Sequence, residues 1–183
     1  GILVASPANP TGSMVDKETL KNLINTAHEN NVSFISDEIY HGIQYENNPT
    51  TALEITDKCY VINSFSKYFS MTGWRIGWMI VPEDHVRQVE RLSQNLFICP
   101  PHVSQLTALS AMDANIELNE NVNVYKKNRE ILLEELPKAG LGKFSPPDGA
   151  FYIYVDISKY STDSLNFCKE VLNKAGVAIT PGL

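Results

Sequence analysis

The sequence predicts an α/β protein, with part of a mostly parallel sheet, flanking helices and one antiparallel strand, followed by part of a small C-terminal α/β domain. The first observation is a strand, a helix and a second strand within about 35 residues, which form a βαβ unit with parallel strands and a right-handed crossover. The second is an apolar strand that follows the third predicted strand with no helix between them. The third is a change of pattern after Gly140, where two short apolar runs flank a single helix.

The βαβ unit occupies the first part of the chain. Residues 2–5 form a continuous apolar run, as expected for a strand that is buried on both faces of a parallel sheet. Turn-forming residues follow at 6–12, and Asp16 then opens a helix with apolar residues at helical spacing, namely Leu20, Leu23, Ile24 and Ala27. Asn30 ends this helix, and the second strand covers residues 32–36.

The next elements extend the sheet and then leave it. A third strand is expected at residues 60–62, and a fourth at 76–81 is reached without a helix. Because a short connection cannot make a parallel crossover, the fourth strand should run antiparallel. Two helices follow, separated at Pro100, and their apolar residues are Val86, Val89, Leu92 and Leu96 in the first and Val103, Leu106, Leu109 and Met112 in the second.

The C-terminal part has a pattern of its own. A long helix over residues 117–139 precedes it, and the domain boundary is expected within or near this helix. The sequence then predicts a strand at 150–155, a helix at 162–174 and a strand at 177–179. These two strands would need partner strands from outside this stretch, because a strand is stable only within a sheet.

Composition excludes several classes of function. The formal charge is −6 and the only arginines are Arg75, Arg87, Arg91 and Arg129, so no basic stripe indicates a nucleic-acid partner. There is no apolar run of membrane-spanning length and no signal peptide, which disfavours a membrane location. Three widely separated cysteines, none in a CxxC pair, indicate free thiols in a reducing cytoplasm.

The stretch from Ser64 to Gly77 carries the first chemical signal. Ser64, Ser66 and Lys67 come at the end of an apolar strand, and Arg75 follows Lys67 by eight residues. A lysine that burial or a neighbouring cation keeps partly neutral can form a Schiff base with a carbonyl. Arginine and serine side chains bind phosphate. Taken alone, this pattern favours a solvated strand end, because serines and lysines are common in loops.

Two motifs upstream favour the chemical interpretation. They are Asn9-Pro10-Thr11-Gly12 and Ser36-Asp37-Glu38-Ile39-Tyr40. Asp37 follows Asn9 by 28 residues, and Lys67 follows Tyr40 by 27. In order and spacing the three motifs resemble the class I/II aminotransferases, the aspartate-aminotransferase-like group of pyridoxal-phosphate fold type I. The resemblance covers essentially the whole chain and implies pyridoxal 5'-phosphate as the cofactor.

The resemblance implies a role for each motif residue. Lys67 would hold the cofactor as a Schiff base and then act as the general acid/base at the substrate Cα. Asp37 would pair with the pyridine nitrogen and keep the ring protonated, so that it can absorb electrons. Tyr40 and Asn9 would donate hydrogen bonds to the phenolic oxygen, and Asn9-Pro10 is a cis peptide in relatives. The phosphate would be bound by Ser64, Ser66 and Arg75.

Each of these residues also has a purely structural alternative. Asp37 is at a position where a helix or turn cap is common, although a charge that ends an apolar strand needs a partner. The alternatives for Tyr40, Asn9 and Arg75 are an interior aromatic, a turn residue and a surface ion pair. Glu38 should point away from Asp37 and is the weaker ligand candidate.

Other residues carry less chemistry. His41 is interpreted as a bystander beside the second motif. Cys99 and His102 lack the second pair of ligands that a metal site requires, so no metal is expected. The aromatic run at 151–154 is interpreted as strand core.

Family members are about twice as long as this chain, so the resemblance implies a fragment without the N-terminal half and the extreme C-terminus. Residues 1–125 would be the C-terminal half of the large cofactor-binding domain, and residues 126–183 a partial small domain. The phosphate loop, the stacking aromatic and the arginine that binds the substrate carboxylate would lie outside the chain. The chain by itself is therefore expected to be inactive.

The predicted function of the intact protein is transfer of an amino group from an amino acid to a 2-oxo acid, by a cytoplasmic homodimer. An alternative is a lyase on the same scaffold, either β-eliminating or of the aminocyclopropane-carboxylate-synthase type. A further alternative is the aminotransferase-like sensor domain of a transcription regulator, which would require a DNA-binding domain upstream.

Overall fold

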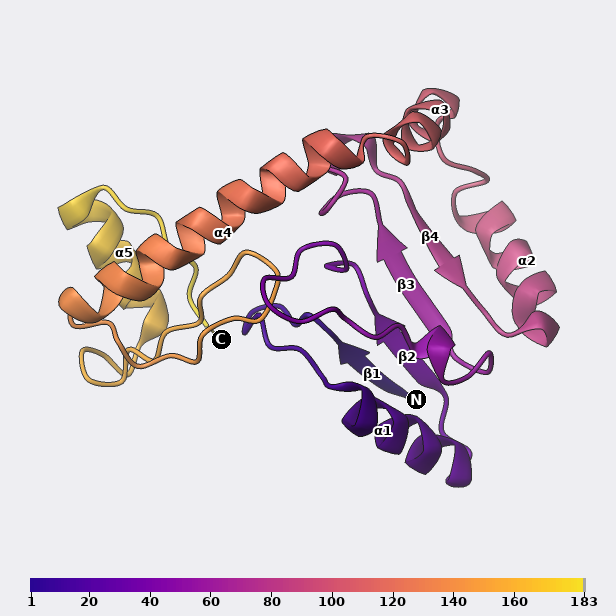
Figure 1. Cartoon of the computed structure of the whole chain (residues 1–183), viewed down its shortest axis with the longest axis horizontal. Coiled ribbons are helices and arrows are strands. Elements are labelled where there is room, and N and C mark those ends of the chain that lie inside the picture. Colours follow the sequence, from indigo (N-terminus) through magenta and orange to yellow (C-terminus); the bar gives the residue numbers. More distant parts are fainter. Residues whose placement is uncertain (183) are drawn as a thin grey trace.

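A four-stranded sheet forms the centre of the computed structural model, which describes residues 1–182. Its strands lie in the order β1 (Ile2–Ala5), β2 (Phe34–Asp37), β3 (Tyr60–Ser64) and β4 (Gly77–Ile80). β1 pairs with β2 and β2 with β3 in parallel, whereas β3 and β4 are antiparallel. The predicted fold class, with its one antiparallel strand, is confirmed (Figure 1).

Helix α1 (Lys17–Glu29) forms the crossover between β1 and β2. It begins as predicted at Asp16, whose carboxylate accepts hydrogen bonds from the backbone N–H and the hydroxyl of Thr19, at 2.9 and 2.6 Å. Its apolar stripe packs on the sheet and forms the main core, which consists of Leu20, Ile24, Ala27, Phe34, Ala52, Cys59 and Val61. Burial of each large apolar side chain here contributes about 1.5–3 kcal/mol to folding.

Strand β1 is not buried on both faces, so that prediction is wrong. Leu3 is 61% exposed and Ile2 is 37% exposed. The reason is that β1 is an edge strand of this sheet, and no segment within residues 1–182 covers the side chain of Leu3. An apolar run shows that a strand can be buried, but not whether a neighbour is present to bury it.

Two helices follow β4, as predicted. They are α2 (Val86–Leu96) and α3 (His102–Ala111), and short 3-10 turns occur at η1 (Ala52–Glu54), η2 (Thr72–Trp74) and η3 (Glu83–His85). Helix α3 buries Ser104 and Ala108, whereas its larger apolar residues Val103, Leu106 and Leu109 and the C-cap residue Met112 are exposed. Ala108 packs with Phe65 and Met71 in a small core cluster next to β4.

The long helix α4 (Asn115–Lys138) confirms the helix that was predicted to precede the C-terminal part. Figure 1 shows it extending from α3 to the C-terminal helix α5 (Ser164–Ala175) at the other end of the molecule. The predicted boundary between residues 125 and 126 falls inside this continuous helix, and the division into two domains stays a prediction.

The strands predicted at 150–155 and 177–179 are wrong. Neither segment has strand pairing, and the nearest such contact is an isolated antiparallel bridge between Gln44 and Gly149. A strand needs a neighbour to accept and donate its backbone hydrogen bonds, and residues 1–182 provide none at these two places. In the part of the chain that the structure describes, no helix is long and apolar enough to cross a membrane.

Candidate active site

The predicted site residues follow the carboxyl ends of the three parallel strands. Asp37 is the last residue of β2, Ser64 is the last residue of β3, and Asn9 lies four positions after the end of β1. Because the three strands run in the same direction, these ends meet at one edge of the sheet. The backbone N–H of Ser6 donates to the carbonyl of Asp37 at 3.1 Å, which holds the loop after β1 beside β2.

Lys67 and Tyr40 come together at this edge. The Nζ atom of Lys67 lies 5.3 Å from the centre of the Tyr40 ring and 5.7 Å from that of Phe151. Both distances are within the range of a cation–π contact. Tyr40 is 2% exposed and Lys67 is half-buried, so the amine faces an aromatic wall on one side.

Tyr40 is held as a neutral phenol. Burial, the neighbouring phenol of Tyr152 and the negative charge of Asp37 raise the pKa of Tyr40 well above its ordinary value. Its hydroxyl therefore keeps its hydrogen at neutral pH and remains a hydrogen-bond donor. A protonated phenol beside a lysine amine can stabilise negative charge on a ligand oxygen.

Asp37 combines a structural role with an available carboxylate oxygen. Its Oδ1 atom accepts a hydrogen bond from the backbone N–H of Ile39 at 3.2 Å, which is the turn role expected as the alternative. Its Oδ2 atom makes no hydrogen bond to any residue from 1 to 182. The second oxygen is thus available to a protonated nitrogen on a ligand.

Ser64, Ser66 and Arg75 belong to one loop between β3 and β4. The N–H of Ser66 donates to Oγ of Ser64 at 3.0 Å, and Oγ1 of Thr72 donates to the carbonyl of Ser66 at 2.9 Å. Nη1 of Arg75 donates to the carbonyl of Thr72 at 2.9 Å. Thr72 therefore joins both ends of the loop.

Arg75 is not a surface ion pair among the described residues, since no carboxylate within residues 1–182 lies within 4.0 Å of its guanidinium. It adopts a left-handed backbone conformation with φ 51° at the end of η2. This conformation is uncommon outside glycine and recurs at ligand sites. Most of its five N–H donors remain available for an anion.

Asn9 lies at the same sheet edge but stands apart from the other candidates. Its side chain is exposed and makes no hydrogen bond within residues 1–182. The Asn9-Pro10 peptide is cis, as the resemblance implied, and Ser6-Pro7 is cis as well. The structure therefore places Asn9 at the site edge without a hydrogen bond to Tyr40 or Lys67.

Two site residues were missed in the sequence, where the run at 151–154 was interpreted as strand core. The hydroxyl of Tyr152 lies 2.6 Å from that of Tyr40, and the Phe151 ring packs edge-on against Tyr40 with centroids 5.5 Å apart. Both residues reach Tyr40 because the residue before them is bound to the loop after Tyr40. The Ala150 N–H donates to the carbonyl of Ile43 at 2.9 Å. No local pattern distinguishes this aromatic run from strand core.

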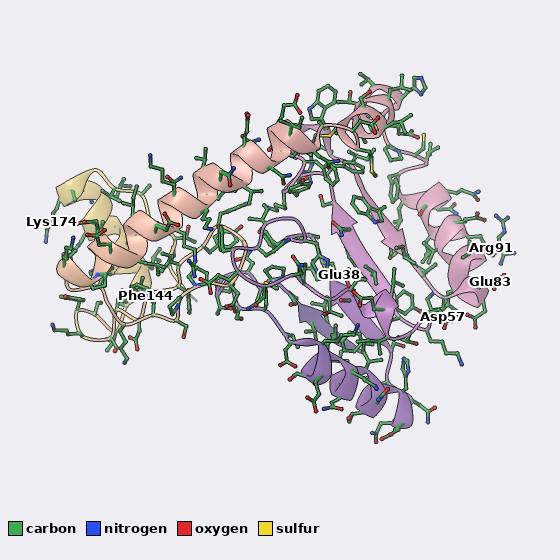
Figure 2. The ribbon with its side chains drawn as sticks, in the orientation of Figure 1. Glu38, Asp57, Glu83, Arg91, Phe144 and Lys174 are labelled. Carbon is green, nitrogen blue, oxygen red and sulfur yellow. The ribbon has the colours of Figure 1, made fainter. Side chains whose placement is uncertain are left out.

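Glu38 points away from the candidate site, as predicted, and is 3% exposed. Its Oε1 accepts hydrogen bonds from Oγ of Ser36 and from the backbone N–H of Ala52, at 2.9 and 2.8 Å. Nδ1 of His41 lies 3.5 Å from its Oε2, and burial lowers the pKa of His41 although the charge of Glu38 opposes this shift. Figure 2 shows Glu38 beside the sheet inside the molecule, whereas Glu83 and Arg91 lie at its periphery.

A cavity of about 350 Å³ lies beside the aromatic wall, a size typical of small-molecule sites. Its lining includes Tyr45, Tyr125, Arg129, Phe151 and Tyr152. The guanidinium of Arg129 lies 5.1 Å from the centre of the Tyr45 ring, and its Nε donates to the carbonyl of Pro147 at 2.8 Å. Arg129 thereby attaches α4 to the segment that carries the aromatic wall.

The donor set at the sheet edge fits pyridoxal phosphate. An amine (Lys67), a carboxylate with one available oxygen (Asp37) and a neutral phenol (Tyr40) match an aldehyde, a ring nitrogen and a phenolic oxygen. Serine hydroxyls and a guanidinium on one loop match a phosphate.

Comparisons with known proteins agree with this fit. Residues 1–183 match the family "Aminotransferase class I and II". The chain is 45% identical over 187 residues to the valine–pyruvate aminotransferase of Mycobacterium tuberculosis, covering 100% of this chain and 48% of that protein.

Solved structures are similar over the same range. A crystal structure of a Silicibacter pomeroyi protein superimposes with a TM-score of 0.97 at 63% identity, covering 100% of this chain and 50% of that one. The aspartate aminotransferase of Thermotoga maritima has a TM-score of 0.90 at 34% identity, covering 98% and 47%. The chain thus spans about half the length of the relatives that it matches.

Proposed function

The chain belongs to the class I and II aminotransferase family, and from this premise we propose that it forms part of a pyridoxal-phosphate-dependent aminotransferase. The intact protein would move an amino group from an amino acid to a 2-oxo acid. The observation that carries the proposal is the position of the Lys67 amine beside the neutral phenol of Tyr40, at the sheet edge where Asp37 ends β2. The valine–pyruvate and aspartate aminotransferases among the relatives support the same reaction class.

Lys67 is proposed as the residue that would hold the cofactor covalently through its aldehyde, with release of water, and whose amine, once the substrate amine takes its place, would move a proton at the substrate Cα. When bound, pyridoxal phosphate supplies an electron sink for the negative charge that develops at that carbon. The rings of Tyr40 and Phe151 lie beside the Lys67 amine and help to position it at the sheet edge.

Asp37 and Tyr40 are proposed to bind the two ends of the cofactor ring. The available Oδ2 of Asp37 would accept a hydrogen bond from the protonated ring nitrogen, and this charge pair would keep the proton there. The hydroxyl of Tyr40 would donate to the phenolic oxygen, with Asn9 as a second donor after movement of its exposed side chain.

The loop between β3 and β4 is proposed as the phosphate site. Ser64, Ser66 and Arg75 would share the phosphate oxygens, and the bond from Thr72 to Ser66 would hold the loop in place. In this proposal residues 1–125 belong to the large cofactor-binding domain and residues 126–183 to the small one. The intact protein would be a cytoplasmic homodimer.

The test is to add pyridoxal phosphate to the chain, record the visible absorption, reduce with borohydride and map the labelled peptide. The expected result is a visible band and a single label on Lys67. Lys67→Ala should lose both, and the matched control Lys58→Ala, at an exposed lysine nine positions earlier, should keep both. A label that persists in Lys67→Ala, or that spreads over surface lysines of the parent chain, would refute the assignment of Lys67.

The same samples test the expectation that this chain is inactive by itself. No amino-group transfer to a 2-oxo acid is expected, because the chain spans about half of its relatives. Turnover above that of Lys67→Ala would contradict this expectation while supporting the reaction class.

A further inference from the structure

The contact between Tyr40 and Tyr152 joins two distant parts of the chain inside the candidate site. Their hydroxyl oxygens lie 2.6 Å apart although the residues are 112 positions apart in sequence. Their rings meet edge to face, with centroids 5.7 Å apart and an interplanar angle of 79°. The two hydroxyl groups are thus close enough for a short hydrogen bond between neutral phenols.

The position of Tyr152 does not depend on this contact alone. The preceding backbone is bound to the loop after Tyr40, since Ala150 N–H donates to the carbonyl of Ile43 at 2.9 Å and the Tyr45 hydroxyl donates to the carbonyl of Ala150. The N–H groups of Asp148 and Gly149 both donate to the carbonyl of Gly12 at 2.9 Å. Tyr152 is therefore delivered to Tyr40 by a firmly bound segment.

A tyrosine hydroxyl has one hydrogen to donate and can accept others. If the Tyr40 hydrogen pointed at Tyr152, it would not be available to a ligand. If Tyr152 donates to Tyr40 instead, the Tyr40 hydrogen is directed elsewhere, and each bond in such a chain strengthens the next.

We propose that Tyr152 is a positioning residue that donates its hydroxyl hydrogen to Tyr40 and thereby directs the Tyr40 hydrogen at the phenolic oxygen of pyridoxal phosphate. This role rests on the proposed function, whereas the short distance between the two hydroxyl oxygens is a property of the fold. Tyr152 touches no reacting atom in this arrangement and acts only through Tyr40.

The groups around Tyr40 define what a titration would report. The charged groups that face it are the Lys67 amine, at 5.3 Å from its ring centre, and the Asp37 carboxylate. The phenols packed around the same cluster are those of Tyr45, Tyr68, Tyr125 and Tyr152. The His41 imidazole is paired with Glu38, with 3.5 Å between its Nδ1 and Oε2 of Glu38.

The experiment compares Tyr152→Phe, Tyr40→Phe and the double variant, with Tyr154→Phe as the control. Tyr154 is two positions away and 48% exposed. After loading with pyridoxal phosphate, the pH midpoint of the visible absorption is measured for each protein. A donor on the phenolic oxygen favours loss of a proton from the lysine–cofactor bond, so a weaker donor should raise the midpoint.

Tyr152→Phe is expected to raise the midpoint by ~0.4 pH unit, which is about half of the effect of one neutral hydrogen bond. Tyr40→Phe should raise it further, the double variant should match Tyr40→Phe, and Tyr154→Phe should leave it unchanged. An unchanged midpoint in Tyr152→Phe, or an additional shift on the Tyr40→Phe background, would overturn the proposal.

A measurement without cofactor separates this inference from the proposed function. In a double-mutant cycle on urea unfolding, the two hydroxyl groups should show a coupling of about fivefold in the unfolding equilibrium constant, as one net hydrogen bond provides. Absence of coupling would overturn the proposed hydrogen bond between the two hydroxyl groups. Failure of Lys67 to take up the borohydride label would overturn the proposed function and leave the coupling as a fact about the fold.

Discussion

Gly12 offers the sharpest test of how the site is assembled. It lies in the loop after β1 with φ +69°, and its carbonyl accepts hydrogen bonds from the N–H groups of both Asp148 and Gly149. A Cβ added at Gly12 would lie 2.3 Å from Cβ of Pro147 and 2.7 Å from the carbonyl oxygen of Gly149. Gly12→Ala should therefore displace the segment that carries Phe151 and Tyr152 to the site.

The expected loss of folding stability in Gly12→Ala has two parts, and control variants at other glycines allow them to be measured separately. A left-handed backbone costs an alanine about 1 kcal/mol relative to glycine. Overlap with well-packed neighbours costs roughly another 2 kcal/mol. Gly12→Ala should thus lower the free energy of unfolding by about 3 kcal/mol.

Gly176→Ala is the matched control. Gly176 has φ +68° at the end of α5, and no atom lies within 4 Å of the added Cβ, so only the backbone cost of about 1 kcal/mol applies. Gly73→Ala has neither a positive φ nor a neighbour within 4 Å, and should change stability by less than about 0.5 kcal/mol.

The assay is equilibrium unfolding in urea, followed by tryptophan fluorescence and far-UV circular dichroism. Gly12→Ala should also reduce labelling of Lys67 by pyridoxal phosphate and borohydride under conditions where the variant is still folded, because Phe151 forms part of the wall beside the amine. Equal losses of stability in Gly12→Ala and Gly176→Ala would show that Pro147 and Gly149 move away from the added Cβ with no loss of folding free energy. That result would refute the packing argument.

Two further predictions concern buried groups away from the cofactor. Glu38→Ala should lower the free energy of unfolding by ~3 kcal/mol, because the Ser36 hydroxyl and the N–H of Ala52 lose their acceptor. The control Glu83→Ala, at an exposed residue, should lower it by less than ~0.5 kcal/mol. A similar loss in both variants, measured by urea unfolding, would contradict this prediction. Burial raises the pKa of the Cys59 thiol to about 11, so at pH 8 a disulfide reagent such as Ellman's should modify the exposed Cys99 and leave Cys59 unmodified until urea is added. Rapid modification of Cys59 in the native chain, detected by peptide mapping in Cys99→Ser, would contradict the second prediction.

Much of the sheet and most of the motif positions could be predicted from the sequence, because both depend on residues that are close together in the chain. The helix from Asp16 follows from a cap and apolar residues at helical spacing, and both are found. The antiparallel direction of β4 follows from the short connection between β3 and β4. Asp37 and Ser64 end neighbouring parallel strands, so their common edge also follows from strand direction.

The errors occur where a segment depends on a neighbour that its own residues do not specify. Residues 150–155 have the composition of a strand, but they have no pairing partner, and Phe151 and Tyr152 pack beside Tyr40 instead. The exposed side chain of Leu3 in the edge strand β1 has the same cause. An apolar run shows that burial is favourable, but not which surface will provide it.

From the sequence alone it was possible to predict the family, the directions of the strands and the candidate residues Asn9, Asp37, Tyr40, Ser64, Ser66, Lys67 and Arg75. The contact of Tyr152 with the Tyr40 hydroxyl and the position of Phe151 beside the Lys67 amine became visible only in the folded chain. The physical reason is the range of the interactions. Strand direction and helix spacing are set by residues a few positions apart, whereas the contact of Tyr152 with Tyr40 depends on how Gly12 and Ile43 bind a segment more than a hundred residues later.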